Sequence, residues 1–377
     1  MLPQTMLMII AFFINVNKKF AIKKKCAIIS LLIFENVVKR SFLHMSSIYE
    51  IAKAAGLSPS TVARALRGTG YCSPEKREKV LAIAREMNYI PSHAARCLKN
   101  NRTNKVLFCI PDIENPFYFG MIHGVSSVLE EYDYLPVLCP TRGEIQNELK
   151  MLRNLQEGYG DGMVFVSFDF SSKNIDKVNA CKKPVVLTNF YQSPTGEDQF
   201  DCVYPDTRMG ISIACQHFLN MGLTRIGYIG GNAEKQTGRE RFEGYLDAMR
   251  TAGVPIDQRL LRQGDFSRAS GERAMADLLN QPNIPQAVVI ANDLMAVGAY
   301  RICLERGLRV PQDIAIIGMD DSELAQCMNL SSVTLQEEQI GLEAARLLME
   351  RILGKRQEKT IIRLQPRLAI RASSEKI

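Results

Sequence analysis

Polar side chains close several apolar runs in the second part of the chain. Asn189 ends the run PVVLTN, Asn292 ends AVVIAN, and Asp320 ends IAIIGMD. Short runs rich in branched residues are typical of buried strands, and the carboxyl ends of parallel strands meet at one edge of a sheet. Because amide and carboxylate groups hydrogen-bond to pairs of hydroxyl groups, these positions indicate a site for a small polar ligand.

Residues of this kind also have a simpler role. Asn and Asp directly after a strand often cap the next helix, because their side-chain oxygens accept hydrogen bonds from its first backbone amides. We expect Asp293 and Asp206 to serve mainly as helix caps. Phe117, in the segment DIENPFY after the first apolar run, fits a ligand site and a packed core equally well.

The sequence contains no pattern for catalysis. Its four histidines lie outside any nucleophile or metal-ligand pattern, and it has no G-x-S-x-G, G-x-x-x-x-G-K-[ST] or G-x-G-x-x-G motif. The ten cysteines form no C-x-x-C pair, which argues against a zinc site or a disulfide framework and fits a reducing cytoplasm. We therefore expect a cytoplasmic binding protein that is not an enzyme and that uses no cofactor or metal.

A compact segment at residues 46–68, SSIYEIAKAAGLSPSTVARALRG, predicts two short helices. Ser47 opens a capping box, and Gly56 allows the left-handed backbone that ends a helix. Ser58 and Pro59 then suit the cap and the first position of a second helix, where no backbone N–H is needed.

The second helix has two different faces. Val62, Ala65 and Leu66 would pack against the first helix. The outer face would carry Pro59, Ser60, Thr61 and Arg64. Two short helices joined by a turn that contains glycine describe a helix-turn-helix, whose second helix enters the DNA major groove. An ordinary αα-corner is the alternative for this stretch taken alone.

A third helix completes the predicted module. Ser73 and Pro74 repeat the cap-then-proline opening. The buried stripe of this helix would be Val80, Ile83, Ala84 and Met87. The segment HAARCLKN that follows carries too little apolar surface for an independent helix, and we expect a linker that folds only when docked.

Charge is divided unevenly along the chain. Residues 45–105 carry a net charge of +7 and residues 1–44 carry +6, which leaves −6 for the remainder of a chain whose net charge is +7. A basic module on an acidic body suits a protein that places one end on nucleic-acid phosphates. A solvated basic face without a partner is the alternative.

Residues 1–44 differ from the rest. Their apolar runs, LMIIAFFINV and AIISLLIF, are separated by lysines, and each is shorter than the roughly 20 residues that span a bilayer. The first positive charges follow the first apolar run, whereas a signal peptide has them before it. We expect translation to start at Met45, with residues 1–44 as an over-extended start. A membrane-tethered regulator is the alternative.

From Lys105 onward, strand-like and helix-like segments alternate. The strand-like runs are VLFCIP, LPVLC, GMVFVSF, PVVLTNF, RIGYIGG, AVVIAN and IAIIGMDD. Amphipathic stretches such as FYFGMIHGVSSVLEEY lie between them. This alternation predicts parallel α/β layers, and seven runs exceed one small sheet, so we expect two lobes.

The residues GLSPSTVARAL, CSPEKREKVLAIAREMNYIPS and HAARCLKN resemble the DNA-binding headpiece and hinge of the lac repressor family of bacterial transcription regulators. The resemblance extends from Ser46 to about Ser374. It implies a helix-turn-helix headpiece at 46–91 and a hinge helix and linker at 92–104. It also implies a two-lobed, doubly wound parallel α/β body at 105–377, similar to periplasmic sugar-binding proteins.

In the headpiece, the resemblance implies base contacts from Ser60 and Arg64, with Pro59 beside them. Arginine bound through two hydrogen bonds to guanine is the commonest specific contact. Leu98 matches the hinge leucine that wedges into the minor groove. The other residues assigned to DNA are Thr61, Arg67, His93, Arg96 and Lys99.

In the body, the resemblance implies a ligand cleft between the lobes. Its lining would be Phe117, Tyr118, Asn189, Lys235, Thr237, Arg241, Phe266, Asn292 and Asp320. Polar groups beside aromatic faces suit a sugar or sugar derivative, because aromatic rings cover its apolar C–H side. Lys235 and Arg241 leave an anionic ligand such as a sugar phosphate open.

These observations predict a transcription regulator, specifically a repressor, whose operator affinity is controlled by a small effector. A homodimer is implied, because its symmetry matches a palindromic double-stranded DNA operator, and no membrane partner is expected. Phe119, Met121 and Ile122 are candidate interface residues. The alternative is a sugar-binding transport or chemotaxis receptor without DNA function, which would leave the basic module unexplained. An enzyme is a third hypothesis.

Overall fold

The computed structural model describes residues 47–68, 70–89, 97, 102–167, 172–191, 198 and 200–375. Our expectations for residues 1–44 lie outside this part of the chain. The predicted hinge contacts lie outside it as well, at His93, Arg96, Leu98 and Lys99.

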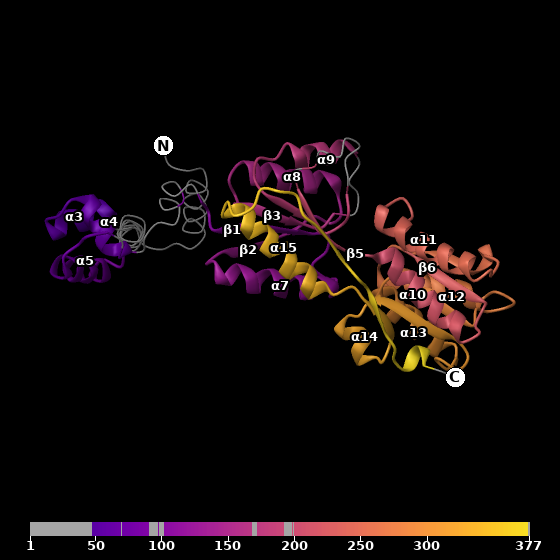
Figure 1. The fold of residues 1–377 in the computed structure, drawn as a ribbon. Helices are drawn as coiled ribbons and strands as arrows, with labels where there is room; N and C mark the ends of the chain where they lie inside the picture. The colour runs from indigo at the N-terminus through magenta and orange to yellow at the C-terminus, as the bar shows by residue number, and fades with distance from the viewer. Residues whose placement is uncertain are drawn as a thin grey trace, which may run out of the picture. The chain divides into compact units, whose positions relative to one another are not determined.

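The chain forms two compact units that divide between Lys99 and Asn100 (Figure 1). The first unit contains three helices: α3 (Ile48–Ala55), α4 (Pro59–Arg67) and α5 (Pro74–Glu86). Their small core is built on Ile51, Ala52, Ala55, Val62, Ala65, Val80 and Ala84. The predicted buried faces of α4 and α5 are confirmed, with Leu66, Ile83 and Met87 packed at the edge of this core.

Local side-chain chemistry fixes the ends of α3 and α4. The Ser47 Oγ accepts a hydrogen bond from the Glu50 amide at 3.3 Å, and the Ser47 amide donates to the Glu50 carboxylate at 2.7 Å. Gly56 ends α3 with φ 67°, and Ser58 caps α4 through the Thr61 amide at 3.2 Å. These caps and the turn between them are as predicted. Each cap satisfies amides that would otherwise lack a partner.

Ser73 departs from the prediction. It lies at the cap position before α5, but its side chain makes no cap hydrogen bond. The backbone geometry and Pro74 at the first helical position therefore begin α5 without that contribution.

The second unit contains two six-stranded sheets. The first has the order β11 (Ile361–Leu364), β5 (Asp201–Pro205), β4 (Val185–Leu187), β3 (Gly162–Phe165), β1 (Lys105–Ile110) and β2 (Leu135–Pro140). The second has the order β12 (Arg367–Ala369), β10 (Ser331–Thr334), β9 (Ala315–Asp320), β8 (Ala287–Ile290), β6 (Ile226–Gly230) and β7 (Leu261–Gln263). Every neighbouring pair is parallel except β10 and β12.

Helices cover both sheets. The first lobe, built on the β11–β2 sheet, has α7 (Phe117–Glu131), α8 (Ile145–Gln156), α9 (Ser172–Asn179) and α15 (Glu337–Ile352). The second lobe has α10 (Thr207–Asn220), α11 (Gln236–Thr251), α12 (Arg268–Leu279), α13 (Asp293–Glu305) and the short α14 (Glu323–Cys327). Two 3-10 turns complete it, at Gln258–Leu260 and Ala372–Ser374.

Alternation along the strands builds the cores. In β1, Val106, Phe108 and Ile110 pack against α7 and α15, while Leu107 and Cys109 pack on the opposite face against α8 and α9. Helices α7 and α15 lie side by side (Figure 1). The second lobe has one core in which α10 packs beside α11 and α12 beside α13. This arrangement confirms the predicted two-lobed, doubly wound α/β body with an all-α headpiece.

The chain crosses between the lobes three times: after β5, after β10 and after β11. The crossing segments are bonded to one another, since the Asp206 amide donates to the Leu364 carbonyl at 3.1 Å and the Gln336 side chain donates to the Gln365 carbonyl at 2.6 Å. Three short connections of this kind allow each lobe to rotate as a rigid body relative to the other.

All seven predicted strands are present. The five that were missed are β5, β7, β10, β11 and β12. These strands are short, and some are polar, such as SSVT of β10 and LRQ of β7. They therefore lack the apolar run from which a buried strand is predicted. Within the described part of the chain, every helix is too short or too polar to cross a membrane.

Candidate functional site

The outer face of α4 presents polar groups to solvent. Pro59, Ser60, Arg64 and Arg67 are exposed, and Thr61 is half-buried. The Arg64 Nε donates to the Ser60 carbonyl at 3.4 Å, which aligns its stem along the helix. Neither Arg64 nor Arg67 forms an ion pair with another described residue. The predicted outer face therefore offers cationic hydrogen-bond donors that no carboxylate of the described headpiece neutralises.

A cavity of about 650 Å³ lies between the lobes of the second unit. Its walls come from loops at the carboxyl ends of strands in both sheets, the place where ligands of open α/β sheets bind. All nine residues that the sequence placed in a cleft line this cavity: Phe117, Tyr118, Asn189, Lys235, Thr237, Arg241, Phe266, Asn292 and Asp320.

A buried carboxyl and a buried guanidinium face this cavity. Asp320 is the last residue of β9 and is only 5% exposed. Burial and the neighbouring Asp293 carboxyl raise the pKa of Asp320 well above its ordinary value, although Arg241 opposes that rise. Arg241, 8% exposed, extends its guanidinium over the Phe266 ring at 5.2 Å from the centroid. Within the described residues Arg241 forms no ion pair. The Arg241 guanidinium can therefore donate to a ligand, and the Asp320 carboxyl can accept from it.

Other polar groups in the lining differ in how far they are already used. The Thr237 hydroxyl is buried and has no hydrogen-bond partner among the described residues. The Asn292 side chain is engaged, because its oxygen caps α13 through the Met295 amide at 3.1 Å and its nitrogen donates to the Phe266 carbonyl at 3.0 Å. Asn292 therefore fixes the shape of the wall, whereas Thr237 has capacity left for a ligand.

Phe266 is held in an uncommon backbone conformation. Its φ is 69°, in the left-handed region that residues with large side chains rarely adopt. Gly231 makes the placement possible, because a Cβ there would lie 2.0 Å from the ring edge. The ring lies against the Gly231 backbone and beneath the Arg241 guanidinium, and forms an apolar surface of the cavity.

The cap assigned to Asp293 is wrong. Asn292 caps α13, and Asp293 is the first residue inside the helix. Its buried carboxylate accepts hydrogen bonds from the Ser322 amide at 2.8 Å, the Ser322 hydroxyl at 2.9 Å and the Ser332 hydroxyl at 2.6 Å. Burial raises its pKa to about 7. Asp293 therefore ties α13 to the segment after β9 and to β10, directly behind the cavity wall.

Asp206 behaves as predicted, since its side chain accepts from the Met209 amide at 3.0 Å and caps α10. The prediction that Met121 belongs to an exposed interface is wrong, because Met121 is 1% exposed in the first-lobe core. It lies on the inner face of α7, whereas Phe119 lies on the outer face and is 55% exposed.

Two hydrogen bonds at the start of α11 join the lobes. The Lys235 ammonium donates to the Gly143 carbonyl at 3.2 Å, and the Gln236 side chain donates to the Phe190 carbonyl at 2.9 Å. Both donors stand at the start of α11 in the second lobe, and both acceptors are backbone atoms of the first lobe. Asn189 donates to the Ser167 carbonyl.

The structure adds charged residues that the predicted list omits. Asp112, Arg142 and Asp265 also line the cavity. The sequence indicates Asp112 as a candidate, since it closely follows the predicted strand β1 within DIENPFY. Arg142 follows β2, a predicted strand, but it is basic, whereas the polar residues sought after strands are Asn and Asp. Asp265 follows β7, which the sequence does not predict as a strand.

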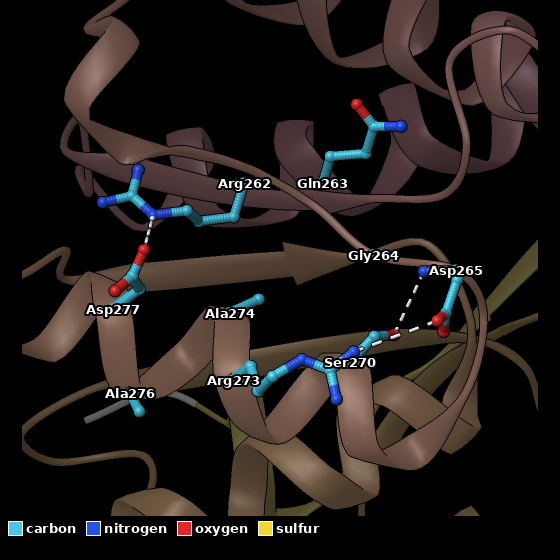
Figure 2. A pocket seen from close by; sticks show the side chains of 9 residues that line it. All are labelled: Arg262, Gln263, Gly264, Asp265, Ser270, Arg273, Ala274, Ala276 and Asp277. Atoms are coloured by element: carbon cyan, nitrogen blue, oxygen red, sulfur yellow. Dashed lines mark hydrogen bonds and ion pairs between the residues drawn. The ribbon is translucent and has the colours of Figure 1, made fainter.

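A second depression, of about 720 Å³, lies beside β7 (Figure 2). Its charged groups are already paired. Arg262 of β7 reaches Asp277 of α12 at 3.1 Å, and Arg273 reaches the Asp265 carboxylate at 3.9 Å. None of the nine predicted ligand residues lies in it. Within the described residues no cluster of three or more His, Cys, Asp or Glu side chains is arranged to hold a metal.

Comparison with known proteins identifies the family. Residues 47–92 match the bacterial regulatory proteins of the lacI family, and residues 215–374 match a periplasmic binding protein-like domain. The chain is 34% identical over 332 residues to the ribose operon repressor of Escherichia coli (strain K12), covering 88% of this chain and all of that protein. It is 31% identical to the HTH-type transcriptional repressor PurR of Photobacterium profundum, covering 87% of this chain and 98% of that protein.

The chain belongs to the lacI family. As a member of the lacI family it is a DNA-binding transcription regulator. Among solved structures, the lacI-family protein is similar to the transcriptional regulator CelR in complex with cellobiose, with 31% identity, a TM-score of 0.66 and coverage of 87% and 99% of the two chains. It shares its fold with the lac repressor dimer bound to operator, with 23% identity, a TM-score of 0.78 and coverage of 87% and 98%.

Proposed function

We propose that this lacI-family protein is a repressor whose affinity for a palindromic operator changes when a sugar or sugar derivative fills the cleft between its lobes. The observation that carries the proposal is the presence in one chain of an exposed, cationic α4 face and a cavity with unpaired polar groups. We assign DNA reading to residues 46–91, the hinge to 92–104 and effector binding with dimerisation to 105–377.

On the DNA side, we assign base contacts to Ser60 and Arg64 and supporting contacts to Pro59, Thr61 and Arg67. The exposed N-terminal half of α4 supports this assignment, because that end of a recognition helix meets base edges in the major groove. A homodimer places two such helices on the two half-sites of a palindrome. The operator and the nucleoid lie in the bacterial cytoplasm, which we infer to be where the protein works.

On the ligand side, a polyol suits the chemistry of the cleft. The Asp320 carboxyl accepts from ligand hydroxyls, while Arg241 and Thr237 donate to ligand oxygens. The Phe266 ring covers an apolar C–H face. Relatives support the class: one is named for the ribose operon, one was solved with cellobiose, and a lacI-family regulator of Enterococcus faecium at 25% identity was solved with ribose.

The proposed mechanism couples these two sites through lobe closure. A ligand that contacts both lobes stabilises the closed arrangement by the difference between its affinities for the closed and open states. Closure rotates one lobe about the three crossing segments and thereby alters the separation of the two hinges in a dimer. A coupling free energy of about 1–3 kcal/mol would change operator affinity roughly 5- to 150-fold.

The deciding experiment measures DNA binding by the full chain to its own upstream region at fixed salt, with and without a panel of sugars and sugar phosphates. Salt is fixed because phosphate contacts make affinity strongly salt-dependent. Specific binding that one compound shifts supports the proposal and identifies the effector and the direction of its action. Tight sugar binding without any specific DNA affinity would instead support the sugar-receptor alternative. The relatives are transcription regulators, and we assign no catalysed reaction.

A further inference from the structure

Two cysteines far apart in the sequence are neighbours in the first sheet. Cys109 of β1 is the register partner of Cys139 of β2, and the two strands are parallel. Side chains of register partners point to the same face, and both thiols pack in the core between this sheet and helices α8 and α9. Adjacent strands lie about 4.8 Å apart, within the roughly 4.4–6.8 Å Cα separation that a disulfide spans.

The two thiols have different environments. Cys109 is completely buried, whereas Cys139 is half-buried on β2, the edge strand of the sheet. The neighbouring Cys109 thiol lowers the Cys139 pKa, while burial raises the Cys109 pKa well above its ordinary value. The Cys139 thiol donates to the Val137 carbonyl of its own strand at 3.3 Å. The more accessible sulfur is therefore also the one that ionises more readily, which is the arrangement of an attacking thiolate beside a resolving thiol.

The pair lies directly below the rim of the cleft. The residues that follow Cys109 lead to Asp112, and those that follow Cys139 lead to Arg142 and Gly143; all three line the cavity. The Thr141 amide donates to the Ile110 carbonyl at 2.8 Å, so the ends of the two strands are already joined by one hydrogen bond. A covalent link one residue earlier would hold both rim segments in a fixed register.

We propose that Cys109 and Cys139 form a dithiol that hydroperoxides oxidise to a disulfide, joining β1 to β2 beneath the cleft rim. The Cys139 thiolate attacks one peroxide oxygen and breaks the O–O bond. This gives a sulfenic acid and an alkoxide or hydroxide, which takes up a proton. The Cys109 sulfur then attacks the Cys139 sulfur and breaks its S–O bond, and the departing hydroxide takes the Cys109 proton as water. The two thiols lose two electrons and the peroxide gains them.

The consequence for ligand binding rests on the proposed function, whereas the chemistry does not. Oxidation would stiffen the segments that carry Asp112 and Arg142 and would thereby change how readily the cleft accepts its ligand. Such a link could be reversed by thiols in the cell, since the sulfur on an edge strand is open to attack.

The test treats the full chain with hydrogen peroxide, alkylates the remaining thiols and maps the non-reduced peptides by mass spectrometry. We expect a Cys109–Cys139 linked peptide that dithiothreitol removes. Cys139→Ser should abolish it. Cys327→Ser is the matched control, because Cys327 is exposed on α14 and should leave the link intact. Overoxidation of Cys139 without a link, or a link to another cysteine, would overturn the proposal in the wild-type chain itself, whatever the variants do.

A second measurement tests the effect on the rim without any ligand. Amide hydrogen exchange of residues 141–144 should slow at least threefold in the oxidised chain and recover on reduction. An unchanged rate in protein that carries the disulfide would show that the link forms but does not restrain the rim. Because no effector is used, this outcome is independent of whether the cleft binds a sugar.

Discussion

The α4 face and the inter-lobe cleft are built in opposite ways. The residues of α4 that we assign to DNA are close together in sequence and all exposed except the half-buried Thr61, and their side chains support little except the helix on which they lie. The cleft residues are drawn from segments that extend from Phe117 to Asp320, and several are buried and bonded into the fold. The DNA-binding residues therefore lie on a single helix, whereas the ligand cleft is formed only where the two lobes meet.

This difference predicts that function and stability separate in the headpiece, whereas in and behind the cleft they separate only for side chains that do not hold the fold together. An exposed side chain on a helix can be removed with an effect on stability of less than about 0.5 kcal/mol. A buried carboxylate that holds several elements together cannot, because its removal leaves polar groups without partners. Substitutions in the two regions should therefore fall into distinct patterns.

The largest effect is expected at Asp293. Asp293→Ala should lower the free energy of unfolding by about 3 kcal/mol, because Ser322 and Ser332 lose a shared buried acceptor. Urea unfolding measures this directly. Asp293→Asn should lose less, since an amide oxygen still accepts. A loss for the alanine variant below about 1 kcal/mol, the net value of a single ordinary hydrogen bond, would show that the segments behind the cleft do not depend on this carboxylate.

The same residue predicts a dependence of stability on pH. Burial raises the folded-state pKa of Asp293 to about 7, above its ordinary value near 3.8, so the folded protein binds the proton more tightly than the unfolded chain. Its contribution is fully present below about pH 4 and is lost as pH rises through about 7. Asp293→Asn should flatten the measured stability profile over this window. An unchanged slope would assign the dependence to other groups.

Asp320 should show loss of function without loss of stability. Asp320→Asn should weaken binding of the effector found in the sugar panel about 30-fold, or about 2 kcal/mol, because an amide donor replaces one of the two carboxyl oxygens that accept from ligand hydroxyls. Its unfolding free energy should stay the same or rise, since burial disfavours the charged carboxylate in the folded state. Calorimetric titration and urea unfolding test the two halves. Unchanged ligand affinity would remove Asp320 from the proposed site.

Arg64 provides the contrast in the headpiece. Arg64→Ala should weaken operator binding at least tenfold, because one well-placed arginine discriminates bases by roughly 1–3 kcal/mol. Effector affinity and the unfolding free energy should both be unchanged. Lys53→Ala, on the neighbouring helix α3, is a control for general loss of positive charge. If both variants lose operator and nonspecific DNA equally, Arg64 contacts phosphate and does not read bases.

The sequence predicted the parts of the molecule that are decided locally. The capping box at Ser47, the left-handed Gly56 and the proline at the start of α4 act within one turn of helix, so they can be recognised from adjacent residues. The apolar strands were equally visible. Strands such as β10 and β12 were not, because their polar residues pair only after distant segments assemble.

The cleft illustrates the same limit. Family resemblance predicts nine of its lining residues, but their individual roles depend on contacts that sequence does not show. Asn292 and Asp293 are adjacent, and only the structure shows which one caps α13 and which one bonds to β10. Lys235 was placed against the ligand, yet in the structure its ammonium reaches the backbone of the opposite lobe.

Lys235 gives the smallest effect and the sharpest comparison between a ligand contact and a closure contact. If its bond to the Gly143 carbonyl is its main role, Lys235→Met should weaken the binding of neutral sugars and of sugar phosphates equally, by about two- to fivefold, because one such hydrogen bond contributes about 0.5–1 kcal/mol. Gln236→Ala, which removes the companion bond to Phe190, should have the same small and unselective effect. Lys235→Met could instead lower affinity for sugar phosphates alone while Gln236→Ala does not. That result would show that Lys235 contacts the ligand and that the effector is an anion. Equal small losses in both variants would show that the start of α11 holds the lobes together, so that selectivity resides deeper in the cleft, at Arg241 and Asp320.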